Sequence, residues 1–256
     1  MKILTFFNNK GGVGKTTMVY HIAWMLSEKG QKVIVADFDP QSNLSAMFLS
    51  AERLEEVFEK EEEKLTILRG IQPVVEGDPY ERVHVEAINE NIGLLIGDLS
   101  LSTFEDRLSD AWLKCLDKDP YAFKVTSVFN SIIADAGEQW EADIVLVDIG
   151  PNLCAINRSV AISSTYLILP VASDLFSLQG IKNLGITLEK WREEWRRREN
   201  PRPTRILSPK GEMIPLGYII MQYTAQSRRP VRAYKRWADR IPKVYQKYLA
   251  TDTQSP

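Results

Sequence analysis

Residues 9–17 combine glycines, two lysines and two threonines in a pattern that suits the binding of a phosphate chain. They read Asn-Lys-Gly-Gly-Val-Gly-Lys-Thr-Thr and directly follow the apolar run 3–7. A strand that ends in a glycine-rich turn and continues into a helix presents backbone N–H groups and the positive end of the helix dipole to an anion. Lys15 is placed to reach the β- and γ-phosphates of a nucleotide, and the Thr16 hydroxyl to ligate Mg²⁺. The predicted phosphate-binding residues are Lys10, Gly11, Gly12, Val13, Gly14, Lys15, Thr16 and Thr17.

Carboxylates follow two other apolar runs. Residues 37–41 read Asp-Phe-Asp-Pro-Gln, and Asp148 directly follows the run 144–147. Acidic residues at the carboxyl ends of parallel strands face the crevice where such sheets bind ligands. We expect Asp148 to hold Mg²⁺ through water, because this small hard ion keeps several of its waters. Asp37 and Asp39 admit two interpretations, as part of this site or as a pair that caps a turn.

The spacing of apolar residues predicts the elements that position these side chains. The predicted strands are 3–7, 33–36, 92–96, 144–147, 166–169 and 216–221. The predicted helices are 16–28, 103–116, 122–136 and 178–198. Alternation of this kind is typical of an α/β fold with a mostly parallel, twisted sheet flanked by helices on both faces. We expect a single domain over residues 1–256.

Composition and charge limit the possible classes. The chain has 256 residues, of which 44% are hydrophobic and 26% charged, as in a soluble globular protein. We expect no membrane span and no signal peptide, because apolar runs are short and the amino terminus enters a core strand directly. Two cysteines make no disulfide framework, and a reducing cytoplasm fits.

The formal charge of −2 hides an asymmetry, since residues 190–256 carry 16 basic and 6 acidic side chains. A basic end on an acidic body favours an anionic partner there.

Two central segments are less informative. Residues 51–64 are acidic and helix-favouring, which predicts a solvated helix face or, as an alternative, a surface for a partner. Residues 70–90 contain Pro73, Gly77 and Pro79, and we expect a loop or a small insertion there.

The loop with two lysines, 10–16, resembles that of the ParA/MinD family of deviant Walker ATPases, and most closely that of the small, Soj-like ParA proteins. The resemblance extends over most of residues 1–225, weakly in 50–140, and implies a P-loop NTPase fold with ATP and Mg²⁺ as cofactors. It also implies an ATP-sandwich homodimer in which Lys10 of one subunit reaches the nucleotide of the other, much as an arginine finger is supplied in trans. The sequence does not identify the residues that contact the nucleotide base, and residues 221–223 are assigned to that role by their position alone.

The same resemblance implies roles for individual side chains. The catalytic residues would be Lys10, Lys15 and Asp39, with Asp39 positioning the attacking water. The Mg²⁺ site would be formed by Thr16, Asp37, Asp39 and Asp148, with Asp37 holding the hydration shell. The family usually continues its second carboxylate strand with two prolines. This chain has Gly150 in the first of those places, and we expect a more pliant loop there.

The basic carboxyl-terminal region, about 228–250, is predicted to form a helix with Pro230 in its first turn and Pro242 at its end or kink. One face would be cationic and the opposite face would pack on the core. A row of cations across a dimer suits sequence-independent contact with DNA phosphates. The predicted DNA-binding residues are Arg228, Arg229, Arg232, Lys235, Arg236 and Arg240. A weaker cationic cluster comprises Arg192 and residues 196–198, among interleaved glutamates.

These features favour an ATPase that dimerises with ATP, binds DNA non-specifically on the nucleoid and positions a plasmid, a chromosome region or other cargo. We expect a ParB-like or other activating partner, slow hydrolysis, and no contact with a membrane. We expect no amino-terminal helix-turn-helix extension, and therefore no recognition of operator sequences. A MinD-like membrane-cycling ATPase is one alternative, but it needs an apolar carboxyl-terminal helix. An iron–sulfur reductase that shares a cluster through Cys115 and Cys154 is another.

Overall fold

The fold is built on a seven-stranded sheet with the strand order β3-β4-β2-β5-β1-β6-β7. The computed structural model describes residues 1–59, 65–200, 207–221, 225–226, 229–230 and 232–250. The strands are β1 (Lys2–Phe6), β2 (Val33–Phe38), β3 (Glu86–Ala87), β4 (Ile92–Leu95), β5 (Ile144–Ile149), β6 (Tyr166–Ala172) and β7 (Ile214–Met221). Neighbouring strands pair in parallel except β3 and β4, which are antiparallel. The predicted α/β fold with a mostly parallel sheet is confirmed.

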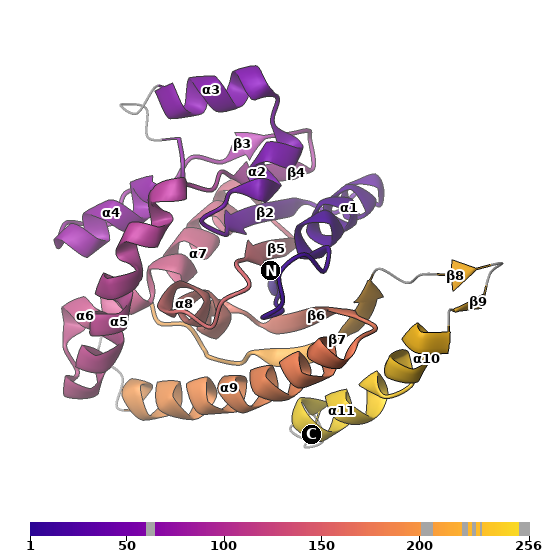
Figure 1. The fold of residues 1–256 in the computed structure, drawn as a ribbon. Helices are drawn as coiled ribbons and strands as arrows, with labels where there is room; N and C mark the ends of the chain where they lie inside the picture. The colour runs from indigo at the N-terminus through magenta and orange to yellow at the C-terminus, as the bar shows by residue number, and fades with distance from the viewer. Residues whose placement is uncertain (60–64, 201–206, 222–224, 227–228, 231, 251–256) are drawn as a thin grey trace.

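Side chains of the central strands alternate between two hydrophobic clusters, because successive residues of a strand point to opposite faces. In β2, Val33 and Val35 belong to one cluster, and Ile34 and Ala36 to the other. The first face is covered by α1 (Lys15–Glu28), α2 (Asn43–Phe48) and α3 (Ala51–Glu59). The second cluster contains residues of α4 (Leu68–Glu76), α5 (Glu105–Lys114), α6 (Pro120–Thr126), α7 (Val128–Trp140), α8 (Ala155–Ser163) and α9 (Leu175–Glu199). The sheet is therefore covered on both faces (Figure 1).

Several predicted boundaries need correction. The predicted loop 70–90 is wrong in its first part, because α4 runs to Glu76 and buries Ile71 and Val74 against the sheet. The predicted helix 122–136 is two helices, since α6 ends at Thr126 and α7 begins at Val128. The predicted helix 103–116 consists of α5 flanked by the 3₁₀ turns η2 (Leu99–Phe104) and η3 (Cys115–Asp117). The acidic segment forms α3 up to Glu59, and its remainder lies outside the described residues.

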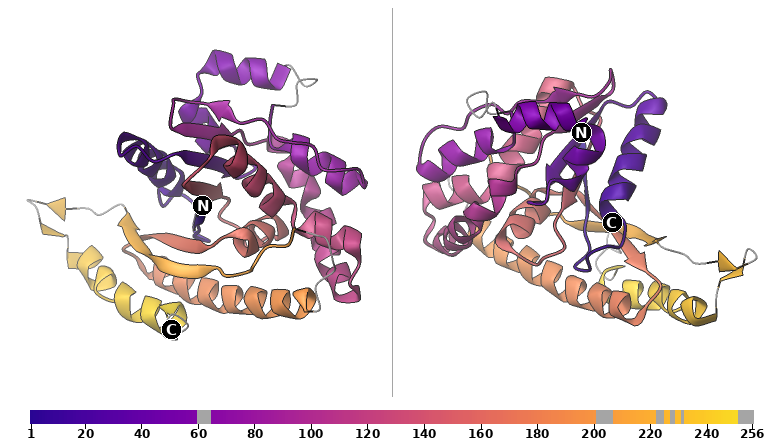
Figure 2. Two further views of the ribbon diagram at one scale, coloured as in Figure 1. Left: turned by 180° about the vertical axis from the view of Figure 1, so that it is seen from behind. Right: turned by 45° about the horizontal axis from the view of Figure 1, so that its top comes forward.

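The carboxyl-terminal region differs most from its prediction. A helix starting near Arg228 is wrong, because β8 (Ala225–Gln226) and β9 (Arg229–Pro230) pair as a small hairpin before α10 (Arg232–Ala238) begins. Arg228 itself lies outside the described residues. Pro242 does not end a helix but lies in the first turn of α11 (Ile241–Tyr248), where a missing N–H leaves no bond unmade. Helix α11 lies alongside α9, as both views of Figure 2 show.

An aromatic contact connects α7 with the end of β2. Phe38 and Phe129 are fully buried, and their rings meet edge to face with centroids 4.9 Å apart. We expect Phe129→Ala to lower the free energy of unfolding in urea by about 3–5 kcal/mol, because it removes this contact and leaves a cavity. The matched control is Leu113→Ala, whose side chain is exposed and whose effect should stay within about 0.5 kcal/mol. Equal effects of the two changes would contradict the central position of Phe129.

Candidate functional site

The loop between β1 and α1 has the backbone form that a phosphate cradle requires. Gly12 and Gly14 have φ angles of 70° and 86°, in the left-handed region that glycine enters without strain. A β-carbon at position 14 would also lie only 3.0 Å from the Cε atom of Met221, at the end of β7. Helix α1 begins directly after Gly14, at Lys15. Its free N–H groups and the positive end of its dipole therefore face the loop.

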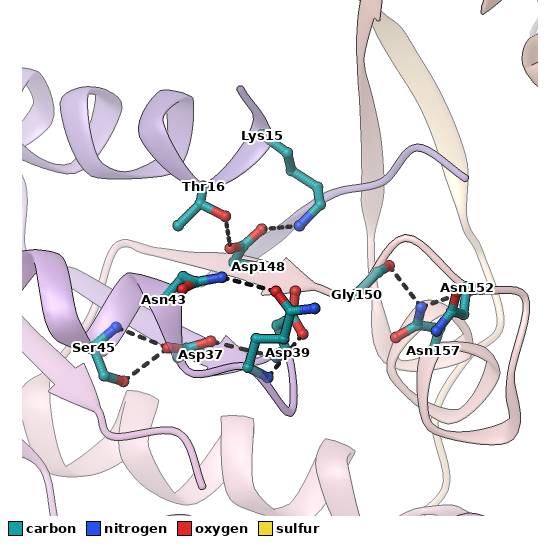
Figure 3. A network of polar contacts seen from close by, with 11 residues as sticks. Lys15, Thr16, Asp37, Asp39, Asn43, Ser45, Asp148, Gly150, Asn152 and Asn157 are labelled. Atoms are coloured by element: carbon teal, nitrogen blue, oxygen red, sulfur yellow. Dashed lines mark hydrogen bonds and ion pairs between the residues drawn. The ribbon is translucent and has the colours of Figure 1, made fainter. Parts of the chain in front are cut away.

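Asp148 connects the two side chains of this loop that were predicted to meet phosphate and metal. The Lys15 Nζ atom lies 2.5 Å from Asp148 Oδ1, and the Thr16 hydroxyl donates to Oδ2 over 2.6 Å (Figure 3). Asp148 is fully buried near the end of β5. Burial raises the pKa of this carboxyl, and the interactions with Lys15 and Thr16 oppose that rise. The Lys15 ammonium is thus held by the buried carboxylate of Asp148.

Asp37 lies next to Asp148, because β2 and β5 pair in a register that sets the two residues opposite each other. The backbone N–H and the hydroxyl of Ser45 both donate to Asp37 Oδ2 over 2.8 Å. Burial, followed by the negative charge of Asp148, raises the pKa of Asp37 to about 7, and the bonds from Ser45 act in the other direction. Ser45 is in turn held by the Gly97 N–H, which donates to its hydroxyl oxygen over 2.9 Å.

Asp39 occupies the turn after β2 and faces the loop after β5. Its Oδ1 atom accepts a bond of 3.0 Å from the Gln41 N–H. A β-carbon at Gly150 would lie 3.5 Å from that same Oδ1, so the two loops are in close contact. The Asn157 amide donates to the Gly150 carbonyl over 2.7 Å and also to the Asn152 carbonyl. These two bonds restrain the loop at which we expected greater pliancy.

A cavity of about 830 Å³ lies over the loop, a volume within the range of small-molecule sites. Its lining brings the whole predicted loop together with Asp39 and with residues of α2. The lining residues are Lys10, Gly11, Gly12, Val13, Gly14, Lys15, Thr16, Thr17, Asp39, Gln41, Asn43, Ala46, Met47 and Pro151. Asp37 and Asp148 are fully buried and are not among the lining residues.

The electrostatics of the site favour a cation that arrives with a polyanion. Asp37, Asp39 and Asp148 are buried close together, and Lys15 contacts one of them. In the part of the chain that the structure describes, no three acidic, histidine or cysteine side chains form a group able to hold a metal ion. The donor set nevertheless fits Mg²⁺, which is commonly held by one or two protein oxygens together with substrate phosphates and water. A metal here would therefore be completed by the phosphates.

Lys10 has contacts that the sequence did not predict. Its backbone N–H donates to the Asn8 side chain over 3.0 Å, and its ammonium forms an ion pair with Asp174. Asp174 precedes α9, and its Oδ1 atom accepts from the Ser177 N–H as an N-cap. The Asp-Leu-Phe-Ser sequence at the start of a helix signals such a cap, but not the partner 164 residues away. The sequence also did not predict the roles of Ser45, which bonds to Asp37, and of Asn157, which bonds to the loop after β5.

The predicted DNA-binding residues lie on other elements. Lys235 and Arg236 are exposed on α10, and Arg240 is exposed directly before α11. Arg229 lies in β9, and Arg232 is the first residue of α10.

In the weaker cationic cluster, Arg192 and Arg198 bond to the backbone of the fold. Arg198 is 4% exposed and donates to two backbone carbonyls, and Arg192 donates to those of residues 212 and 213. Arg196 and Arg197 remain exposed.

The raised pKa of Asp37 predicts a pH dependence of stability in the absence of nucleotide and Mg²⁺. The folded protein binds this proton more tightly than the unfolded chain, so stability is highest below about pH 4 for this group and is lost as the pH rises to about 7. The difference is on the order of 4 kcal/mol. Urea unfolding from pH 4 to pH 8 should show this loss, and Asp37→Asn should remove it.

The matched control is Asp110→Asn, at an exposed position on α5, which should keep the dependence of the unmodified protein. An identical slope in the Asp37 variant would show that another group is responsible.

Comparison with known proteins agrees with this geometry. The AAA_31 family model, described as an AAA domain, matches residues 1–200. Protein MJECL24 of Methanocaldococcus jannaschii is 27% identical over 95% of this chain and 82% of its own length. The chromosome-partitioning ATPase Soj of Thermus thermophilus is 28% identical, over 72% of this chain and 60% of its own length.

Solved structures share the fold. Protein DIP2308 of Corynebacterium diphtheriae superposes with a TM-score of 0.84 at 26% identity, covering 98% of this chain and 88% of its own. An ATP complex of Cyanothece McdA has a TM-score of 0.65 at 16% identity, with coverage of 97% and 80%. Cobyrinic acid a,c-diamide synthase of Mycobacterium smegmatis, with bound ADP and magnesium, has a TM-score of 0.67 at 20% identity, with coverage of 95% and 82%. The chain therefore belongs to the AAA_31 family of AAA domains, and its resemblance to the ParA family is confirmed.

Proposed function

We propose that this chain is an ATPase that dimerises when it binds ATP, contacts DNA without sequence preference and so positions a plasmid, a chromosome region or other cargo. The observation that carries the proposal is the cavity in which the loop 10–17 faces Asp39 above the buried Asp148. The relatives support it, because Soj is a chromosome-partitioning ATPase and McdA binds ATP on the same fold.

ATP and Mg²⁺ are the ligands that this site suits. The loop amides and the Lys15 ammonium would hold the phosphates, and the Thr16 hydroxyl and Asp148 would face the metal. Mg²⁺, when bound, neutralises charge on the phosphates. Lys15 and Thr16 now contact Asp148, so both must exchange part of that contact for phosphate and metal. Asp37, behind Asp148, would hold waters of the metal shell.

Asp39 is the residue we assign to the attacking water. It lines the cavity, it is 7% exposed, and the Gln41 N–H holds one of its oxygens. Phosphoryl transfer depends mainly on positioning and on charge stabilisation, and a fixed carboxylate contributes the first of these. The Asn157 bonds to the facing loop keep the opposite wall in place.

Dimerisation through the rim of the cavity is supported by the side chains found there. Large apolar side chains next to the rim are exposed, with Leu153 at 41%, Leu175 at 54% and Phe176 at 75%. Leu153 lies two residues after Pro151 of the cavity wall, and Leu175 directly follows Asp174, the ion-pair partner of Lys10. Exposed apolar surface beside a charged site is typical of an interaction surface. A second subunit would cover it and bring its own Lys10 to the nucleotide.

The exposed cations on α10 and directly before α11 are the proposed contact with DNA. Lys235, Arg236 and Arg240 are exposed, while Ile241 is fully buried and holds α11 against the body. Backbone phosphates need cations without base contacts, and this suits a cargo-positioning protein that covers DNA of any sequence. A ParB-like or other partner that accelerates hydrolysis completes the proposed cycle.

A MinD-like membrane cycle is not supported by α11. This helix is amphipathic, but Ile241 and the following Leu249 are buried, and Val244 and Tyr245 pack against the core. Its apolar face is therefore occupied within the chain. Among the described residues, no helix combines the length and apolar character needed to cross a bilayer.

An iron–sulfur reductase is not supported by the cysteines. Cys115 is fully buried and lies 3.4 Å from the Thr126 hydroxyl, within the helical layer of α5 and α6. Burial raises the pKa of its thiol, which disfavours the thiolate that a cluster needs. Cys154 precedes α8 and is half-buried. A cluster shared between subunits needs both side chains at a surface.

The two lysines of the loop should separate nucleotide binding from dimerisation. We expect Lys15→Ala to weaken ATP binding by about 100-fold, because it removes charge-assisted bonds to phosphate. Lys10→Ala should bind ATP within about threefold of the unmodified protein yet form no dimer, because its contact is made across the interface. Calorimetry measures the first quantity and sedimentation velocity with ATPγS and Mg²⁺ the second. Normal dimerisation of the Lys10 variant would remove its role in trans.

Charge reversal on α10 should weaken DNA binding without changing ATP binding. We expect Lys235→Glu with Arg236→Glu to weaken ATP-dependent retention of random-sequence DNA in a gel shift by at least about tenfold, and to flatten its salt dependence by about two units per subunit. The matched control is Lys114→Glu with Lys124→Glu, at exposed positions on α5 and α6. Equal DNA binding by the two double variants would place the DNA contact elsewhere.

A further inference from the structure

The ion pair between Lys10 and Asp174 joins the phosphate loop to the start of α9, across 164 residues of sequence. We propose that Asp174 is a positioning residue that holds Lys10 within its own subunit until nucleotide and a second subunit replace it. This inference rests on the proposed function, because it concerns the lysine that we expect to act in trans. In this proposal, the Asp174 carboxylate competes with the nucleotide phosphates for the Lys10 ammonium.

The pair is part of a built contact. The Asn8 side chain accepts from the Lys10 N–H, and its amide donates to the Pro170 carbonyl on β6. A β-carbon at Gly180, on α9, would lie 2.7 Å from the Asn9 side-chain oxygen, so this position of the helix has no room for a side chain. The head of the loop is thus bonded to β6 through Asn8 and to Asp174 through Lys10, and Asn9 between them lies close to α9. The Lys10 ammonium lies against the first turn of that helix.

Asp174 is suited to hold a cation and to release it. One oxygen accepts from the Ser177 N–H as the cap of α9, which leaves the other for Lys10. Burial alone would raise the pKa of Asp174, but the bonds from Lys10 and Ser177 lower it below its ordinary value, so the carboxylate stays charged at neutral pH. The side chains are 34% and 32% exposed. Solvent therefore screens the pair, and a triphosphate can compete with it.

The expected magnitude follows from symmetry. A partly exposed ion pair of this kind shifts an equilibrium by about twofold to fivefold. A symmetric dimer must release two such pairs, one from each subunit, so the factor enters the dimerisation constant squared. Removal of the pair should therefore tighten dimerisation by about fourfold to twenty-fivefold, provided that the cap of α9 is kept.

Asp174→Asn meets this condition, because an asparagine oxygen caps a helix as well as an aspartate does while the charge is lost. We expect its dimer dissociation constant, measured by sedimentation with ATPγS and Mg²⁺, to fall by about fourfold to twenty-fivefold. The difference from the unmodified protein should shrink as salt rises from about 0.05 M to about 0.5 M, because the pair is screened. In nucleotide-free protein, the variant should react faster at Lys10 with an amine-directed reagent, as mass spectrometry of the peptide can show.

The matched control is Asp119→Asn, which alters another capping aspartate, at α6, away from the loop. It should change neither the dimer constant nor the labelling of Lys10. An unchanged or weaker dimer in the Asp174 variant, or unchanged labelling, overturns the inference. The outcomes for the two proposals are distinct. Absence of a dimer in the unmodified protein overturns the proposed function, whereas equal constants in both proteins overturn the role of Asp174 alone.

Discussion

Burial of negative charge at the ends of β2 and β5 is the constraint on which the site depends. Asp37 and Asp148 are opposite each other in adjacent parallel strands, and both are fully buried. Ionised carboxylates at such positions need cations or hydrogen-bond donors. Lys15 and Thr16 supply these to Asp148, and Ser45 supplies them to Asp37. The start of α1 and the first turn of α2 are thereby drawn to one point, and the ligand cavity lies above it.

The sheet and the loop could be predicted because their signals are local. Apolar runs such as 33–36 and 144–147 are buried on both faces, and a strand buried in this way reads as a continuous apolar segment. The carboxylates follow these runs directly, so the sheet edge at which they meet follows from the parallel topology. Glycines at positions 12 and 14 likewise carry their own backbone preference. The predicted loop residues and Asp39 therefore line one cavity.

What could not be predicted depends on contacts between distant segments. Pro73 lies within helix α4 and Gly77 directly follows it, and these two residues predict a loop. Burial of Ile71 and Val74 outweighs those local preferences. In the carboxyl-terminal region, Pro230 suits both a first helical turn and a short edge strand, and the structure has the strand. The pairing of Lys10 with Asp174 has no local signal at all. Side chains of long-range ion pairs are brought together by the fold.

Helix α9 connects the two ends of the proposed activity. At about 1.5 Å per residue, its 25 residues span roughly 37 Å. Its first turn holds the Lys10 ammonium, and its body packs against α11, which follows the cations of α10. Leu184 and Leu188 of this helix are buried, which packs its body against the rest of the fold. The proposed release of Lys10 would therefore change the restraint on the same helix that packs against α11, and the proposed nucleotide and DNA contacts would share α9.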